Sequence, residues 1–254
     1  SNILKISELA KKNKLFLIED TCESLGSQYN GKFLGTFGDF GTYSFYYSHQ
    51  ITSGEGGMIV CNNIEDYRLI YSMRSHGWDR GLKKKFKKKQ DTSFNFINSG
   101  FNLRPTDVTA AIGFSQLRRL NSMIKIRSEN REKIINKLIN SPLWRDQFTF
   151  FNPTEKVKPS WFGFSFLINK EYLSRKEVFL KHLNQKGIET RKIISGNFMN
   201  QPSTKLYNLN PRRKVFTNAQ KIDDRGFFIG LHTKPISEKT LNYLEKNLLV
   251  INKK

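Results

Sequence analysis

The chain has 254 residues, of which 37% are hydrophobic and 13% aromatic, so two modest domains with real cores are expected and disorder is not. No apolar run is long enough to cross a bilayer, and the first residues lack a signal-peptide pattern, which favours a cytoplasmic protein with no membrane partner. Two cysteines, Cys22 and Cys61, form neither a disulfide framework nor a four-thiolate cluster site, so a reducing compartment is expected.

The formal net charge of +21 at pH 7 leaves several interpretations open. The one dense basic run is KKKFKKK, Lys83–Lys89, and such a run is usually a solvated loop. Clustered lysines can also bind nucleic acid by releasing counterions from phosphates, and a basic surface suits an anionic small substrate such as a nucleotide diphosphate. Because the other positive charges are spread along the chain, we favour the loop and expect no nucleic-acid partner.

The first elements read as a helix followed by a strand. Ile3, Ile6 and Ala10 share one helical face, and LFLI, Leu15–Ile18, is typical of a buried strand. A helix that leads into a buried parallel strand needs neighbouring strands, and the sequence offers few candidates for them. We therefore expect the chain to begin partway through a larger domain whose front part is missing.

The middle of the chain predicts two strands and then mostly helix. The strands are Thr42–Tyr47 and Met58–Val60, and a helix follows over Ile64–Arg74. Pro105 and Thr106 are expected to open a second helix, and helical signals continue to about Leu138. The apolar stripe of that second helix consists of Val108, Ala111 and Ile112.

The remainder reads as a smaller α/β unit. Ser160–Ile168 has the aromatic, alternating character of a strand. Ser174 and Glu177 predict a capping box, with Leu173 and Val178 as its hydrophobic staple, and Gly187 is a plausible stop for that helix. Ser237 is expected to cap a last helix, whose inward side chains are Leu241, Leu244 and Leu248.

Candidate chemical groups lie near the front of the chain. His49 stands alone in SFYYSHQITSGEGG; it is either a polar residue satisfied in a turn or a group placed to move a proton near neutral pH. Asp20 and Glu23 follow a strand, where ligands bind in open α/β sheets, so Asp20 is either a turn residue or a carboxylate for a cationic ring nitrogen. Ser44 could donate its hydroxyl to a phosphate. The glycines fit no phosphate-loop spacing.

The order and spacing of these residues are more specific. The stretch EDTCESLGSQYNGKFLGTFGDFGTYSFYYSHQITSGEGGMIV resembles the cofactor-binding core of the DegT/DnrJ/EryC1/StrS family, whose members are pyridoxal-phosphate (PLP) enzymes acting on nucleotide-linked sugars. The resemblance continues through RSHGWDR, GFNLRPTDVTAAIGFSQL, GIETRKIISGNF and RGFFIGLH, and so covers nearly the whole chain.

The resemblance implies an α/β fold of the aspartate-aminotransferase type, PLP fold type I. Its large domain has a mostly parallel sheet, and its C-terminal domain is a smaller α/β unit. Residues 1–121 would be the C-terminal part of the large domain, without its front part. Residues 122–254 would be a linker helix and the small domain.

The resemblance also assigns roles to residues. His49 occupies the place of the cofactor-binding lysine of most members, and the histidine-bearing branch consists of sugar 3-dehydratases, so His49 is expected to be a catalytic acid/base. Asp20 would pair with the pyridine nitrogen, Glu23 would lie near the ring hydroxyl, and Ser44 would bind the cofactor phosphate. Asn102 would reach that phosphate across a homodimer.

The implied substrate is a nucleotide-linked 4-keto-6-deoxy sugar, most simply GDP-4-keto-6-deoxymannose, with pyridoxamine phosphate (PMP) regained from glutamate. Candidate substrate residues are Arg104, Arg191, Arg225 and His232. The alternative for each is a surface or interface polar residue, and for Arg225 and His232 the two interpretations are about equal. No metal is expected, and no iron–sulfur cluster, because the segment after RSHGWDR has no cysteine. A nucleotide-sugar aminotransferase and a catalytically silent paralogue are the alternatives.

Overall fold

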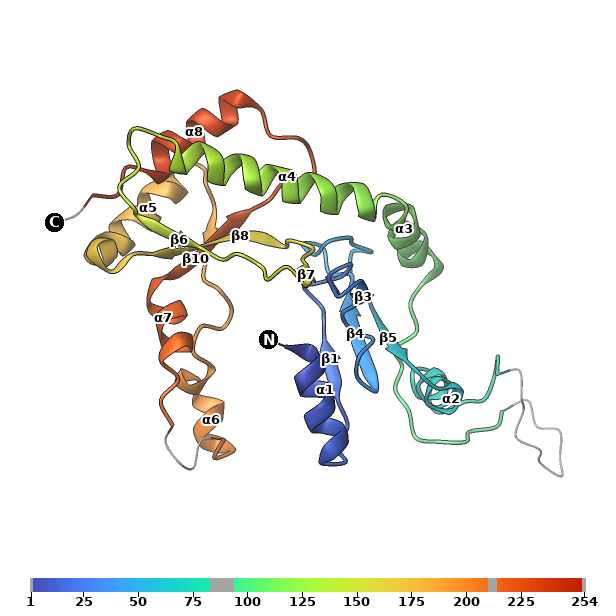
Figure 1. Ribbon diagram of the computed structural model, residues 1–254. Helices are drawn as coiled ribbons and strands as arrows, with labels where there is room; N and C mark the ends of the chain where they lie inside the picture. Colours follow the sequence, from blue (N-terminus) through green and yellow to red (C-terminus); the bar gives the residue numbers. More distant parts are fainter. Residues whose placement is uncertain (1, 83–93, 210–213, 253–254) are drawn as a thin grey trace. The chain divides into compact units, whose positions relative to one another are not determined.

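The computed structural model describes residues 2–82, 94–209 and 214–252, and the chain divides into two compact units (Figure 1). The first unit comprises residues 1–121 and 155–160, and the second comprises residues 122–154 and 161–254. The basic run Lys83–Lys89 lies outside the described residues.

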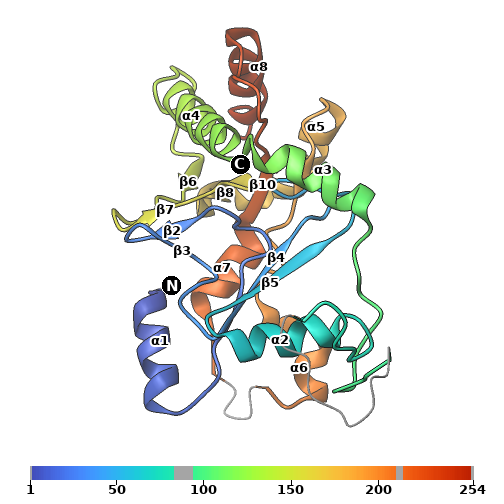
Figure 2. The same ribbon diagram turned by 90° about the vertical axis from the view of Figure 1, so that its right-hand side faces the viewer.

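A three-stranded sheet organises the first unit. β1 (Ile18–Asp20) runs parallel to β4 (Phe40–Ser44), which pairs antiparallel with β5 (Gly57–Cys61). Along β4, Gly41 and Tyr43 are buried whereas Thr42 and Ser44 are half-exposed, as expected when successive side chains point to opposite faces. Figure 2 shows β4 and β5 side by side, with α2 directly after β5. The helices of this unit are α1 (Ile3–Lys12), α2 (Ile64–Met73) and α3 (Asp107–Leu117).

The strand predicted at Leu15–Ile18 is wrong. The strand begins only at Ile18, and Leu15 and Phe16 are 64% and 84% exposed. The reason lies in Asp39, whose Oδ2 accepts a hydrogen bond from Leu17 N over 2.8 Å and whose N–H donates to Leu17 O over 2.9 Å. The backbone of Leu17 therefore pairs with this aspartate and not within a ladder.

A second, smaller sheet brings a distant segment to the first unit. The hairpin of β2 (Gln28–Tyr29) and β3 (Lys32–Phe33) turns at Asn30-Gly31, and both residues have positive φ (48° and 77°), as a type I′ turn requires. β7 (Val157–Lys158) pairs antiparallel with β2.

The second unit is built on a four-stranded sheet in the order β6-β8-β10-β9, and every neighbouring pair is antiparallel. Phenylalanines fill its core: Phe164 and Phe166 are fully buried, and the rings of Phe166 and Phe227 stack with centroids 5.0 Å apart. The strands are β6 (Phe148–Phe150), β8 (Gly163–Ile168), β9 (Thr190–Arg191) and β10 (Gly226–Gly230).

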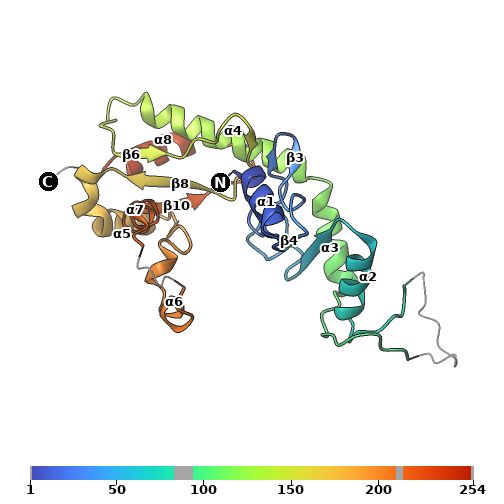
Figure 3. The ribbon, with the colours of Figure 1, turned by 60° about the horizontal axis from the view of Figure 1, so that its bottom comes forward.

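Helices close this core. α4 (Leu120–Ile139) and α8 (Glu238–Leu248) lie side by side (Figure 3), and Lys137 Nζ is 3.2 Å from Glu245 Oε2. A shared hydrophobic cluster joins the sheet to side chains of α4, α5 and α8. The other elements are a 3₁₀ turn η1 (Lys170–Arg175), α5 (Lys176–Gln185), a 3₁₀ turn η2 (Phe198–Asn200), α6 (Pro202–Leu206) and α7 (Thr217–Arg225).

The helix-end predictions had mixed outcomes. Ser237 caps α8, accepting a hydrogen bond from Thr240 N, and Gly187 follows α5 with φ of 74°, so both predictions are confirmed. The capping box at Ser174 and Glu177 is wrong. Ser174 lies inside η1, and α5 begins after Arg175 without a side-chain cap. A residue with helical backbone geometry cannot serve as the half-extended cap.

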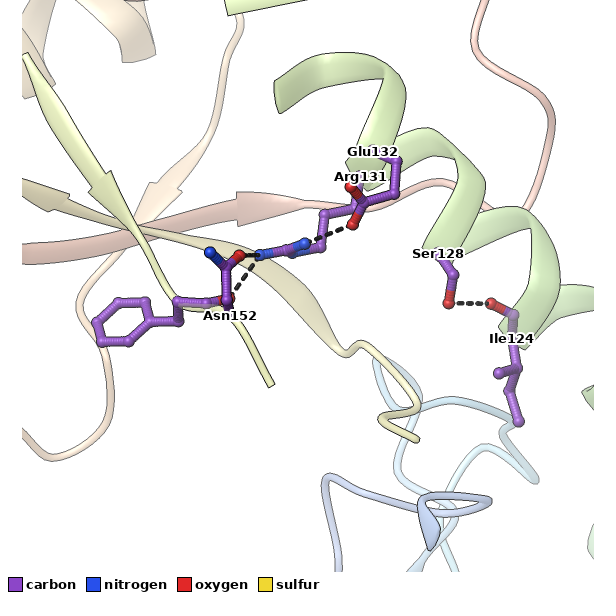
Figure 4. Close-up of polar contacts among 6 residues, drawn as sticks. Ile124, Ser128, Arg131, Glu132 and Asn152 are labelled. Atoms are coloured by element: carbon purple, nitrogen blue, oxygen red, sulfur yellow. Dashed lines mark hydrogen bonds and ion pairs between the residues drawn. The ribbon is translucent and has the colours of Figure 1, made fainter. Parts of the chain in front are cut away.

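Polar side chains on the buried face of α4 also hold the second unit together. Arg131 is 2% exposed, and its guanidinium reaches the backbone oxygen of Phe151 and Oδ1 of Asn152 (Figure 4). The same guanidinium lies over the ring of Trp161, 4.3 Å from its centroid. Burial lowers the pKa of Arg131, against the opposing effect of Glu132 at 2.6 Å.

Candidate active site

The parallel pair of strands places three polar residues on one open face of the first unit. Asp20 ends β1 directly beside Thr42 of β4, and Thr42 Oγ1 lies 3.5 Å from Asp20 Oδ1. Ser44 lies two residues further along β4, so it shares the face of Thr42. This is the carboxyl edge of a parallel pair, the place where α/β sheets bind ligands.

Hydrogen bonds keep the Asp20 carboxyl ionised. The Cys22 side chain, the Cys22 backbone N–H at 3.2 Å and Thr42 hold the pKa of Asp20 below its ordinary value, against a smaller opposing effect of burial. Asp20 is otherwise exposed. An ionised, accessible carboxylate can pair with a cationic group.

Glu19, the residue before Asp20, fixes the loop that leads into β4. Its side chain is buried, and its carboxylate accepts backbone hydrogen bonds from Gly35 (2.7 Å), Phe37 (2.6 Å) and Gly38 (2.7 Å). The sequence analysis did not single out Glu19. Its place next to Asp20 on the opposite face of a short strand was the available signal.

His49 lies in the loop between β4 and β5. Its backbone N–H donates to Tyr46 O over 3.0 Å, and its ring meets the Tyr46 ring edge-on with centroids 5.6 Å apart. The next two residues, Gln50 and Ile51, are 2% and 3% exposed. His49 is therefore half-exposed, whereas the two residues that follow it in the loop are buried.

Glu23 is joined to this loop. Its side chain is exposed, and its backbone oxygen accepts a hydrogen bond from the Gln50 side-chain amide. The structure thus brings Asp20 and Ser44 to one strand pair, and Glu23 to the loop of His49, within the first unit.

Asn102 and Arg104 lie in another part of the first unit. Asn102 bridges to Ser75, and the hydrogen bond from Phe101 N to Met73 O (2.6 Å) fixes the same contact. Here the backbones are so close that a Cβ on Gly100 would lie 2.3 Å from Gly77 N. Asn102 and Arg104 are exposed, and no printed contact links either side chain to Asp20 or His49.

The other three predicted substrate residues belong to the second unit. Arg191 is exposed on β9, with Nη2 2.9 Å from Glu189 Oε1. Arg225 donates from Nε to Ile168 O over 2.8 Å, so part of its guanidinium ties α7 to the end of β8. His232 is exposed and lines a cavity of 470 Å³ bounded by α4, α8 and the turn at Gly187.

Within the residues that the structure describes, no group of three or more His, Cys, Asp and Glu side chains is arranged to hold a metal ion. Cys22 and Cys61 are both free thiols. A search of the same residues finds no helix with the length and apolar character of a membrane span.

Sequence comparison identifies the family of this chain. The pattern of the DegT/DnrJ/EryC1/StrS aminotransferase family matches residues 1–244. The chain belongs to this family. The resemblance stated from the cofactor-core motif is thereby confirmed.

Two relatives show what this family member is similar to. It is 36% identical to the GDP-4-keto-6-deoxy-D-mannose 3-dehydratase of Escherichia coli O55:H7, over 98% of this chain and 64% of the relative. It is 32% identical to the lipopolysaccharide biosynthesis protein RfbH of Salmonella typhimurium, over 91% of this chain and 55% of that protein. The chain thus spans less than two thirds of the length of either relative.

Solved structures agree. A structure of the E. coli GDP-4-keto-6-deoxy-D-mannose 3-dehydratase with bound hydrated PLP superposes with a TM-score of 0.82 at 34% identity, covering 98% of this chain and 64% of that one. Another structure of a GDP-4-keto-6-deoxymannose 3-dehydratase, with a trapped PLP–glutamate geminal diamine, gives 0.81 at 34% identity and the same coverage. The aspartate-aminotransferase-type α/β fold expected from the sequence is thereby confirmed.

Proposed function

We propose that this family member takes part in the PLP/PMP-dependent removal of the C3 hydroxyl from a nucleotide-linked 4-keto-6-deoxy sugar. The observation that carries the proposal is His49, an imidazole at the position where the family resemblance assigns a lysine. It is supported by relatives named as 3-dehydratases that match almost the whole chain.

The residues of the first unit fit the cofactor. An ionised Asp20 can pair with a protonated pyridine nitrogen. The backbone oxygen of Glu23 is hydrogen-bonded to Gln50, the residue after His49. Ser44 Oγ accepts a hydrogen bond from Tyr46 N over 3.2 Å, which leaves its own hydrogen for a phosphate oxygen. When bound, the cofactor supplies an amine for the sugar ketone and an electron sink. Asn102 is proposed to bind the phosphate of the cofactor held by a partner subunit.

His49 is proposed to hold and move the proton of the reaction. An imidazole cannot form the stable imine that a lysine forms, but it accepts and returns a proton near neutral pH. His49 is half-exposed, and its ring packs edge-on with the ring of Tyr46.

The substrate is proposed to be GDP-4-keto-6-deoxymannose, with glutamate as amino donor and Arg104, Arg191, Arg225 and His232 as substrate residues. This rests on the names of the E. coli and Yersinia pseudotuberculosis relatives and on the PLP–glutamate adduct of a solved relative. The likeness to a lipopolysaccharide biosynthesis protein supports a role in cell-surface polysaccharide synthesis, for which we propose colitose as the end product.

A nucleotide-sugar aminotransferase is the second candidate. The GDP-perosamine synthase of Escherichia coli O157:H7 is 35% identical over 190 residues, covering 75% of this chain and 47% of that enzyme. The sequence disfavours this candidate because no lysine occupies or adjoins position 49. A catalytically silent paralogue would bind cofactor without turnover.

Assembly and location complete the proposal. We propose a homodimer, because α3 buries none of its residues within the described chain and exposes large apolar side chains. A cytoplasmic site of action is proposed because both cysteines are free.

The decisive experiment uses a chimera in which this chain replaces its matched region in the GDP-4-keto-6-deoxy-D-mannose 3-dehydratase of Escherichia coli O55:H7. The chimera is mixed with PLP, glutamate and GDP-4-keto-6-deoxymannose, and the nucleotide-sugar product is weighed by mass spectrometry. Loss of the C3 oxygen, abolished by His49→Asn, is the expected result. An amine in place of the ketone would make the protein an aminotransferase, and cofactor binding with unchanged substrate would favour a silent paralogue.

A further inference from the structure

The buried anchor of the His49 loop is its neighbour, Gln50. The side chain of Gln50 is 2% exposed, and its amide nitrogen donates to Glu23 O and, over 3.4 Å, to Ser160 O. An amide nitrogen carries two hydrogens, so these two bonds use both. The other amide atom, Oε1, is buried and has no hydrogen-bond partner among the described residues. Gln50 is thus held through its two donated bonds.

Both acceptors of Gln50 are themselves fixed. Glu23 follows β1 by three residues, and Ser160 ends the segment that pairs with β2 through Val157 and Lys158. Ser160 N donates to Ser27 Oγ over 2.8 Å, a buried bond between residues 133 apart in sequence. The Gln50 amide therefore links the His49 loop to two other segments of the first unit.

Other hydrogen bonds connect the two ends of the loop. Thr52 N donates to Gln116 Oε1 over 3.2 Å, and the Phe45–Gly56 and Ser53–Phe45 backbone bonds close the loop on itself. Tyr46 and Tyr47 are exposed. Gln50 is a buried side chain of this loop that donates hydrogen bonds to segments outside it, and it directly follows His49.

We propose that Gln50 is a positioning residue for His49: its amide clamps the loop to Glu23 and Ser160 and so holds the imidazole in place against Tyr46. The proposal rests on the proposed function insofar as His49 is the acid/base. It assigns to Ser160, a residue 110 positions away, a part in the geometry of the site.

Two substitutions distinguish the effect of the Gln50 hydrogen bonds from the effect of the volume that its side chain fills. Gln50→Leu keeps much of the volume but removes both donated bonds, which leaves the carbonyl groups of Glu23 and Ser160 without this donor. Gln50→Glu keeps the shape. Ionised, its carboxylate would face two carbonyl oxygens and donate nothing; protonated, it regains one donated bond.

The test is NMR on this chain, selectively labelled at histidine, tyrosine and phenylalanine, with the nuclear Overhauser effect (NOE) between the His49 and Tyr46 rings as readout. Four histidines give four ring signals, assigned by substitution. We expect Gln50→Leu to lose this NOE while the NOE between the Tyr29 and Phe37 rings, in the same unit, persists. Gln116→Leu, which removes the other glutamine link to the loop, is the matched control and should retain the His49–Tyr46 NOE.

An unchanged His49–Tyr46 NOE in Gln50→Leu would overturn the proposal. If Gln50→Leu also loses the Tyr29–Phe37 NOE, Gln50→Glu decides: an NOE that is absent at neutral pH and returns on acidification supports the clamp, and one that is the same at both pH values overturns it. In the chimera, the clamp predicts a lower kcat with an unchanged KM for the nucleotide sugar. Undiminished turnover by His49→Asn would refute the proposed function, whereas the NMR result on the position of the ring would still hold.

Discussion

The backbone N–H of Cys22 donates to Asp20 Oδ1 over 3.2 Å, and the Cys22 sulfur lies 3.7 Å from Thr42 Oγ1. Each residue changes the acidity of the other. Burial and the hydrogen bond to Asp20 raise the pKa of the Cys22 thiol, whereas the hydrogen bonds from Cys22 lower the pKa of Asp20. The pair is therefore a protonated thiol that donates to an ionised carboxylate at neutral pH.

The thiol half of this pair predicts slow alkylation. In a Cys61→Ala background Cys22 is the only thiol, since the chain has two cysteines. Asp20→Asn should speed its reaction with iodoacetamide near pH 8, because removal of the carboxylate lowers the pKa of Cys22 and raises the thiolate fraction. The rate is followed by mass spectrometry, with Asp39→Asn as the control at a carboxylate that contacts Leu17 instead. Equal rates for Asp20→Asn and the parent would contradict the coupling.

The carboxylate half predicts a pH dependence. Because the folded pKa of Asp20 is lowered, its contribution to stability is present at neutral pH and is lost as pH falls below the unfolded value of about 3.9 and through the folded pKa. Cys22→Ala removes the largest cause, so the pKa of Asp20 should rise toward its ordinary value. Titration of the Asp20 carboxyl carbon by NMR measures the change. A midpoint that stays where it was would show that Thr42 and the backbone suffice.

Glu19 should matter more for stability than its exposed neighbours. Glu19→Gln places an NH₂ group against one of the three donating backbone N–H groups, so we expect a loss of about 2 kcal/mol in the free energy of unfolding. Urea unfolding measures it, and hydrogen exchange should quicken at Gly35, Phe37 and Gly38. Glu8→Gln, on the exposed face of α1, should change the free energy by no more than about 0.5 kcal/mol. Similar values for the two variants would argue against a structural role for Glu19.

Local signals in the sequence were reliable where the structure is locally determined. Ser237 and the inward leucines of the last helix behave as predicted, because a cap and a helical face depend on residues a few positions apart. The predicted helix at Ile64–Arg74 is likewise seen as α2, Ile64–Met73. The run Leu15–Ile18 failed because an aspartate more than twenty residues away pairs with Leu17.

The candidate site shows the same limit. Asp20, Ser44 and His49 could be named from one stretch of sequence, and the structure places the first two on adjacent strands. Gln50 and Ser160 could not be named in this way. Their contact depends on a two-residue strand, Val157–Lys158, that pairs with β2 within the first unit, and nothing in its local pattern predicts that partner.

Asn130 should be far more sensitive to substitution than the exposed polar residues of α4. Its amide nitrogen donates to His232 O (3.0 Å) and Lys234 O (2.8 Å), and its oxygen accepts from Ile236 N (2.9 Å), so one buried side chain fixes the segment before α8. Asn130→Ala should lower the free energy of unfolding by about 3 kcal/mol, because it leaves these three backbone groups without partners. Thermal unfolding tests this against Asn136→Ala, an exposed site on the same helix. Equal costs would mean that the segment is held by other contacts.

The exposed side of α3 predicts a mutation that separates the proposed homodimer. Val108 and Ile112 are 70% and 43% exposed, although large apolar side chains on one helix face usually pack against something. A charge buried in an interface without a partner is costly, so Ile112→Glu should halve the molar mass seen by light scattering, from twice the chain's 29.7 kDa to that of one chain. Val178→Glu places the same charge at a 66% exposed site on α5 and should leave the mass unchanged. If Ile112→Glu also keeps the dimeric mass, the subunits meet elsewhere; if the parent is already monomeric, the homodimer proposal fails.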